Sequence, residues 1–354
     1  MIPSAESRIE FLNKIQRILD EGKFTSTYKY ALLLSLAELS VEKGDDSGEE
    51  LTVSLNEIAE KFIRLYWAQS IPFPALEGEG SVLFQNTSGQ AAVINHVSGF
   101  YALHQGSIAR AKRSGNWEAL VSSVRSVIVA QPLWKLQQAA GGSDEFLYRH
   151  KLENNSITLN PGVAYSFRFF YRLICQVVQG AWVNKVSGIK TNNSVLGINQ
   201  DLGEFLFAGS RNSLALYKPF LVELQENRCF YCRKKMRDDS KEVDHFIPWA
   251  RYPVDLGHNF VLSHKACNNS KRDILASLSH LQNWEDRNSC HGTAISDYCT
   301  EKGLVSDLKT SVRIAVWAYE QASPTGSDFW IGKGGYGPML EPASDGWRAI
   351  LSRN

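Results

Sequence analysis

Apolar residues near the start of the chain recur at the spacing of an amphipathic helix. The periodic positions are Ile9, Leu12, Ile15 and Leu19. Gly22 follows them and is typical of the residue that ends a helix. Residues 30–41 are apolar over most of a helical surface, so the pattern predicts a second helix that is buried.

A short strand and a third helix are predicted next. Residues 51–55, LTVSL, have the composition of a strand. Ser54 and Glu57 have the spacing of a capping box, which predicts a helix over residues 55–67. The order helix, helix, strand, helix is loosely similar to a winged helix, but a plain helical scaffold is the preferred interpretation.

The rest of the chain is also predicted to be mainly helical. Residues 89–138 and 272–322 carry helical signals, and residues 162–185 are so apolar and aromatic that a core helix is expected. The segments 146–150 and 156–160 lie on either side of KLENN and are predicted to pair as a hairpin.

Composition is that of an ordinary globular protein. The chain has 354 residues, of which 44% are hydrophobic and 21% charged, and its length predicts two or three domains. The formal net charge is +1, so a basic surface for nucleic acid would have to be local. No apolar run reaches the roughly 18 residues of a membrane span. The amino terminus lacks the pattern of a signal peptide, so a cytoplasmic protein without a membrane partner is expected.

Glycine, asparagine and serine accumulate within residues 186–213, and a domain boundary is expected there. The predicted organisation is a helical N-terminal region over residues 1–200, a small module over 210–285 and a helical C-terminal extension over 286–354. The predicted fold class is therefore mainly α with a small α+β module.

Two pairs of potential metal ligands have the spacing of zinc knuckles. Cys229 and Cys232 are spaced C-x2-C, and His264 and Cys267 are spaced H-x2-C. Four such ligands suit a tetrahedral, structural Zn²⁺ site. The sequence leaves the identity of the fourth ligand open, because His258 or Cys290 is an alternative to His264.

The residues between and beside the knuckles resemble the HNH, or ββα-metal, endonuclease family. The chain has Asp244-His245 followed by Pro248, then Asn259 before an apolar stretch, then Cys267-Asn268-x-x-Lys271. The resemblance covers residues 226–275. It implies a zinc-stabilised nuclease domain that hydrolyses phosphodiester bonds of DNA.

The resemblance also assigns roles to single residues. It implies that His245 is the general base and that Asp244 and Asn268 bind a catalytic Mg²⁺ or Mn²⁺. Asn259 falls on the family position that holds the active-site loop and the base in place. Since neighbouring residues of a strand point to opposite faces, Asp244 and His245 can serve one phosphate only if the strand ends or bends there.

Local charge around the module fits a polyanionic substrate. Lys271 is predicted to contact a phosphate at the start of a helix. Further candidate contacts to nucleic acid are Arg272, Arg251, Lys234 and Lys235. Such contacts position a nucleic-acid backbone without reading its sequence.

The whole layout is similar to stand-alone bacterial HNH proteins of the restriction and phage-defence type. Under this hypothesis the N-terminal region selects the target, binds other proteins of a defence system or restrains the nuclease. The alternative hypothesis is a zinc-stabilised DNA-binding or adaptor protein whose HNH unit is vestigial.

Overall fold

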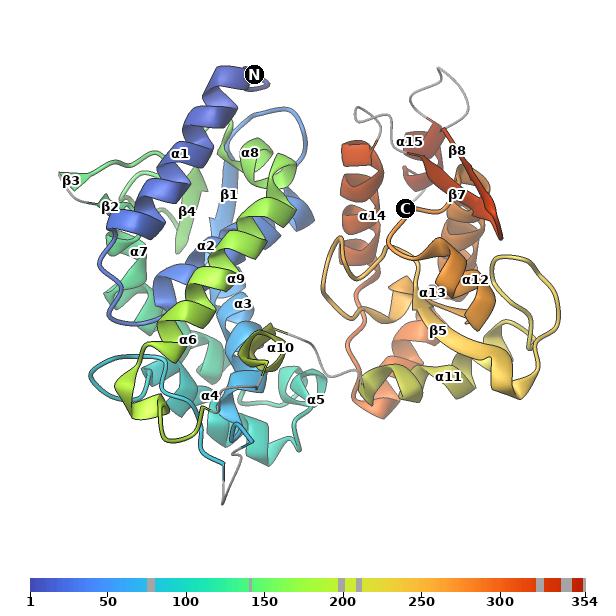
Figure 1. Ribbon diagram of the computed structural model, residues 1–354, viewed down its shortest axis with the longest axis horizontal. Helices are drawn as coiled ribbons and strands as arrows, with labels where there is room; N and C mark the ends of the chain where they lie inside the picture. Colours follow the sequence, from blue (N-terminus) through green and yellow to red (C-terminus); the bar gives the residue numbers. More distant parts are fainter. Residues whose placement is uncertain are drawn as a thin grey trace. The chain divides into compact units, whose positions relative to one another are not determined.

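The chain folds into two compact units, Met1–Ala208 and Gly209–Asn354, in the computed structural model (Figure 1). The fold is mainly α-helical with small two-stranded antiparallel sheets, which confirms the predicted class. The structure describes residues 1–74, 80–139, 142–196, 201–207, 212–322, 328–338 and 346–352. Within the predicted boundary segment, residues 197–200 and 208–211 lie outside the described residues.

The first unit contains most of the helices. Its elements are α1 (Ala5–Glu21), α2 (Tyr28–Lys43), β1 (Leu51–Ser54), α3 (Leu55–Trp67), η1 (Ala68–Ser70), α4 (Ala92–Leu103), α5 (Ile108–Lys112), α6 (Trp117–Ala130), α7 (Pro132–Lys135), β2 (Gln138–Ala139), β3 (Gly142–Ser143), β4 (Ser156–Leu159), α8 (Val163–Phe169), α9 (Tyr171–Ser187), η2 (Lys190–Asn192) and α10 (Leu202–Phe207).

Helix α2 forms the centre of this unit, as its apolar surface predicts. Every residue from Tyr28 to Val41 is buried, and the helix packs against α3, α8 and α9. Helix α1 ends at the predicted Gly22, but its buried face is centred on Phe11, Ile15 and Ile18. Ile9 is 58% exposed, so the predicted apolar stripe was only partly right.

Helix α3 has the predicted bounds because its capping box forms. The Ser54 hydroxyl accepts from the Glu57 amide at 3.2 Å, and the Glu57 carboxylate accepts from the Ser54 amide at 2.9 Å. The single core helix predicted over 162–185 is instead two helices, α8 and α9, separated at Phe170.

The predicted strand over residues 156–160 exists, but its main partner is different. Strand β4 pairs in antiparallel register with β1, with Val53 opposite Ile157. The segment 146–150 contributes only an isolated bridge between Tyr148 and Leu159. The predicted hairpin is therefore present in part, as the antiparallel bridges Tyr148–Leu159 and Glu153–Ser156, while β1 forms the full ladder with β4.

The second unit holds the Cys- and His-rich segment. Its elements are α11 (Asn212–Leu224), η3 (Asp238–Ser240), β5 (Lys241–His245), η4 (Gly257–Asn259), β6 (Phe260–His264), α12 (Lys265–Lys271), α13 (Leu278–Lys302), α14 (Leu308–Ala322), β7 (Phe329–Gly332), β8 (Gly335–Gly337) and α15 (Gly346–Leu351).

Strands β5 and β6 and helix α12 form a ββα module. The strands are antiparallel, with Asp244 opposite Val261 and His245 opposite Phe260. Helix α12 begins directly after β6 and packs on both strands (Figure 1). Behind the hairpin, the Phe246 ring stacks on Trp284 of α13 with ring centroids 5.3 Å apart.

The C-terminal elements complete the same unit. The predicted division at residues 285–286 falls inside α13, which runs unbroken through that point. Beyond α14, the Trp330 indole donates to the Ser270 hydroxyl at 3.0 Å, and the Tyr336 hydroxyl donates to the Ser270 carbonyl at 2.7 Å. The described residues of the C-terminal hairpin therefore contact the ββα module.

Candidate active site and metal centre

The two knuckles bring four potential ligands together. Cys229 and Cys232 lie in a tight turn, in which Arg233 adopts the left-handed conformation at a φ of 60°. His264 ends β6 and precedes α12, and Cys267 lies in the first turns of that helix. The four ligand atoms, three thiols and one imidazole nitrogen, all lie within 4.8 Å of one another.

The buried thiols of this cluster are held in their neutral form unless a cation compensates their charge. Burial raises the pKa of Cys229, and burial together with the neighbouring Cys229 and Cys232 raises the pKa of Cys267 to about 12. Crowded thiols of this kind ionise together only when a metal compensates their charge. A Cys3His set fits tetrahedral Zn²⁺.

His264 is the imidazole of the cluster, and neither predicted substitute lies in it. The His258 ring is buried and donates from Nε2 to the Gly292 carbonyl at 3.1 Å. Cys290 is an exposed residue of α13.

Two of the three predicted catalytic residues, His245 and Asn268, line one cavity of about 620 Å³ in the same unit, whereas Asn259 is not part of its wall. Asp244, His245 and Asn268 all contribute to its wall, together with Trp249 and Arg272. Strand β5 ends at His245, so Asp244 and His245 reach one space although they are neighbours in the sequence. The bend that the sequence requires is therefore present.

The His245 ring is held by an aspartate that sequence reasoning missed. Its Nε2 lies 2.8 Å from the Asp255 Oδ1 atom. Because a carboxylate can only accept, Nε2 carries the hydrogen, and Nδ1 is left as the acceptor atom of the ring. Trp249 and Phe260 pack around the ring, with centroids 5.3 and 4.8 Å away.

Asp244 is 7% exposed and has two buried partners. The Tyr231 hydroxyl donates to its Oδ2 atom at 2.5 Å, and the Lys271 amine lies 3.1 Å from the same oxygen. Burial and the Asp244 charge raise the pKa of Tyr231 well above its usual range, which keeps its phenol a donor.

Lys271 does not occupy the position predicted for it. It is the last residue of α12, its side chain is fully buried, and its amine also donates to the His245 carbonyl at 2.8 Å. A buried amine with these partners is not presented to a phosphate. The predicted phosphate contact is therefore corrected to a contact that holds Asp244 and the end of β5.

The two asparagines make different contacts. Asn259 accepts from the Ile247 amide at 2.8 Å and donates to the Ile247 carbonyl at 3.0 Å, so it pins the loop that follows His245. The Asn268 amide nitrogen donates to the Glu242 carboxylate at 3.1 Å. This contact orients Asn268 with its amide oxygen as the atom available for a cation.

The predicted nucleic-acid contacts lie on the surface of this unit. Lys234 and Lys235 are exposed in the first knuckle, and Arg272 is exposed at the rim of the cavity. Arg251 is partly exposed and donates to the Asp273 carbonyl at 3.3 Å. Their role toward nucleic acid stays a prediction.

The geometry agrees with the comparison to known families. The family model described as HNH endonuclease matches residues 229–273, the segment that contains both knuckles and the catalytic candidates. This match indicates a nuclease, a hydrolase that acts on phosphodiester bonds, with DNA as the substrate that it suggests.

A second family model matches the N-terminal part of the chain. The chain belongs to the family described as domain of unknown function (DUF8808), whose model matches residues 8–201, more than half of the sequence. No curated protein matches the chain. Among the described residues, no helix has the length and apolar character needed to cross a membrane.

Proposed function

We propose that this protein is a metal-dependent DNA endonuclease in which His245 is the general base. The observation that carries the proposal is the placement of Asp244, His245 and Asn268 on the wall of one cavity. The HNH match over the same residues supports it.

His245 is oriented for proton transfer. With its Nε2–H donated to Asp255, the Nδ1 lone pair takes a proton from a water molecule as that water attacks the phosphorus atom. A new bond forms between phosphorus and the water oxygen, and the bond to the leaving sugar oxygen breaks. The leaving oxygen then takes up a proton from solvent.

Asp244 and Asn268 would hold a divalent cation, Mg²⁺ or Mn²⁺. Both residues line the cavity, and their oxygen atoms are the hard ligands that Mg²⁺ prefers. When bound, the ion supplies neutralising charge for the phosphate and the leaving oxygen. A carboxylate has about four lone-pair positions, so Tyr231 and Lys271 leave room on Asp244.

The Cys3His cluster is proposed to hold a structural Zn²⁺. All four protein ligands are supplied, so no position is left for a reacting water. The ion would join the first knuckle to the start of α12 and so stabilise the wall of the cavity.

The second candidate is a DNA-binding or adaptor protein with an inactive HNH unit. The contact of Lys271 and Tyr231 with Asp244 favours it, because the two side chains already occupy part of the carboxylate and lower the number of positions left for a cation.

The nuclease proposal includes a role in bacterial restriction or anti-phage defence, in which the N-terminal region binds partner proteins. This role rests on the resemblance to stand-alone HNH proteins.

Cleavage of supercoiled plasmid by the full-length protein tests the proposal. We expect nicked or linear product with Mg²⁺ or Mn²⁺, none with EDTA, and a loss of roughly 10²- to 10⁴-fold in His245→Ala. Plasmid binding without cleavage in every metal would favour the adaptor. Plaque assays with the parent and His245→Ala test the defence role, since protection must require the nuclease.

A further inference from the structure

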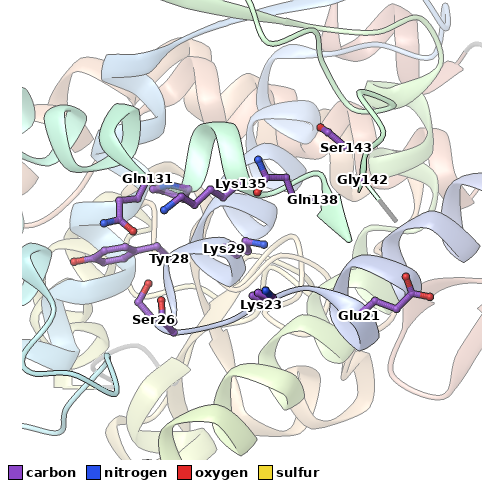
Figure 2. Close-up of a pocket in the computed structure, with 12 residues that line it drawn as sticks. Glu21, Lys23, Ser26, Tyr28, Lys29, Gln131, Lys135, Gln138, Gly142 and Ser143 are labelled. Carbon is purple, nitrogen blue, oxygen red and sulfur yellow. The ribbon is translucent and has the colours of Figure 1, made fainter. Parts of the chain in front are cut away.

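The first unit contains a cationic cavity that the nuclease proposal does not use. It has a volume of about 730 Å³ and lies where the end of α1, the start of α2, α7 and strands β2 and β3 meet. Lys23, Lys29 and Lys135 line it, and Figure 2 shows them among polar side chains such as Ser26 and Gln138. Three lysines from separate segments therefore line one space.

Lys29 is the unusual member of this group. It lies in the first turn of α2 and is only 7% exposed, yet it has no hydrogen bond or ion pair with any described residue. Its nearest described interaction is with the Phe24 ring, 5.2 Å from the amine. Burial and the charge of Lys135 lower the pKa of Lys29 to about 8. The side chain is buried while its amine lines the cavity, so an anionic ligand bound there would compensate the charge of the amine.

The acidic side chain on the cavity wall does not neutralise the amines. Glu21 is bonded to Arg17, with 2.9 Å between the guanidinium Nε and the carboxylate. Lys23 and Lys135 are exposed and, like Lys29, have no ion pair among the described residues. The cavity therefore presents a surplus of positive charge with hydroxyl and amide groups beside it.

We propose that this cavity binds a phosphate-bearing small molecule of nucleotide size, with Lys29 as the buried contact to its phosphate. Its volume falls in the range of roughly 300–1,000 Å³ typical of small-molecule sites. Several amines around one concave space suit the multiple charges of a phosphate chain better than a single carboxylate. This site would give the N-terminal domain a ligand-sensing role that is independent of the nuclease chemistry.

Isothermal titration calorimetry on the full-length protein, without added divalent ions, tests the proposal with ATP, inorganic phosphate and adenosine. We expect one saturable ATP site per chain, weaker binding of phosphate and none of adenosine. Lys29→Met should weaken ATP binding by about tenfold or more, the loss expected for a contact to a charged group. Lys29→Arg should retain more affinity, because it keeps the charge.

Lys185→Met is the matched control. Lys185 is a partly buried lysine of α9 that lies outside this cavity, so ATP affinity should not change. If Lys29→Met does not fold, as judged by circular dichroism, the exposed Lys135→Gln gives the same test. The proposal is overturned if the parent binds neither ATP nor phosphate, or if the cavity variants bind ATP like the parent. Displacement of ATP by a short oligonucleotide at lower concentration would instead assign the cavity to nucleic acid.

Discussion

Asp255 is expected to be a positioning residue for His245, and its removal gives a sharp test of the active site. The carboxylate accepts from His245 Nε2 at 2.8 Å and fixes both the ring orientation and the tautomer. Without it, the ring can rotate or carry its hydrogen on Nδ1, the nitrogen that must accept a proton from water. Asp255→Ala should therefore reduce the cleavage rate without removing the base.

The size of the loss follows from the surroundings of the pair. The side chains of His245 and Asp255 are 13% and 24% exposed, so their hydrogen bond is shielded from water but not fully buried. A hydrogen bond to a charged group contributes about 1.5–3 kcal/mol, and the partial exposure places this one near the lower end. The cleavage rate should fall by about 10- to 30-fold, which is less than the loss in His245→Ala.

Single-turnover cleavage of plasmid at saturating enzyme measures this rate, and gel shifts measure DNA affinity separately. Affinity should stay near that of the parent, because Asp255 contacts the base and not the substrate. Asp297→Ala is the charge-matched control, since Asp297 is an exposed residue of α13. If Asp255→Ala cleaves as fast as the Asp297→Ala control, the carboxylate does not position the base.

Three further outcomes are expected. Metal analysis should find about one zinc per chain, and Cys267→Ser should lose it and unfold the second unit at lower temperature. Asn268→Ala should lose cleavage but recover part of it at high Mg²⁺ or Mn²⁺ concentration, whereas His245→Ala should not recover at any concentration. Lys29→Met should stabilise the protein at pH 7 by about 1–3 kcal/mol, because a lysine whose pKa falls to about 8 on folding destabilises the fold while it is charged. This gain in stability should shrink between pH 8 and 10.5, as Lys29 of the parent loses its proton. Thermal melts of both proteins at pH 7 and pH 10 measure the difference. The other charged residues that line the cavity around Lys29 are Lys135, Lys23 and Glu21.

Local signals in the sequence predict local structure well. The capping box of Ser54 and Glu57 predicted the start of α3, and Gly22 predicted the end of α1. Both signals are local because these residues act on backbone groups next to them in the sequence. Strand pairing was not predictable in the same way. Asn154 and Asn155 adopt left-handed conformations and form the predicted turn, closed by the Glu153–Ser156 bridge. The full ladder of the following strand, however, is with β1, about a hundred residues earlier in the chain, and no local signal indicates that partner.

The spacing also predicted the Cys3His cluster, although it left His258 and Cys290 open as alternatives to His264. A C-x2-C and an H-x2-C pair each place two ligands in one turn, and only the meeting of the two turns depends on the fold. Asp255 gave no such signal. It lies ten residues after His245 in a loop, and its contact depends on how that loop returns to the end of β5.

Lys271 shows why residue type and spacing do not fix a role in a charged site. A lysine near a phosphodiester site suggests a phosphate contact, but the side chain of Lys271 turns inward and is fully buried against Asp244 and the His245 carbonyl. Asp244 alone would be an unpaired charge in a buried position, and Lys271 compensates that charge. Tyr231, in the first zinc knuckle, donates to the same carboxylate. The proposed zinc site is thereby linked through one side chain to the residue that would hold Mg²⁺, so we expect loss of the knuckle metal to disturb the active site directly.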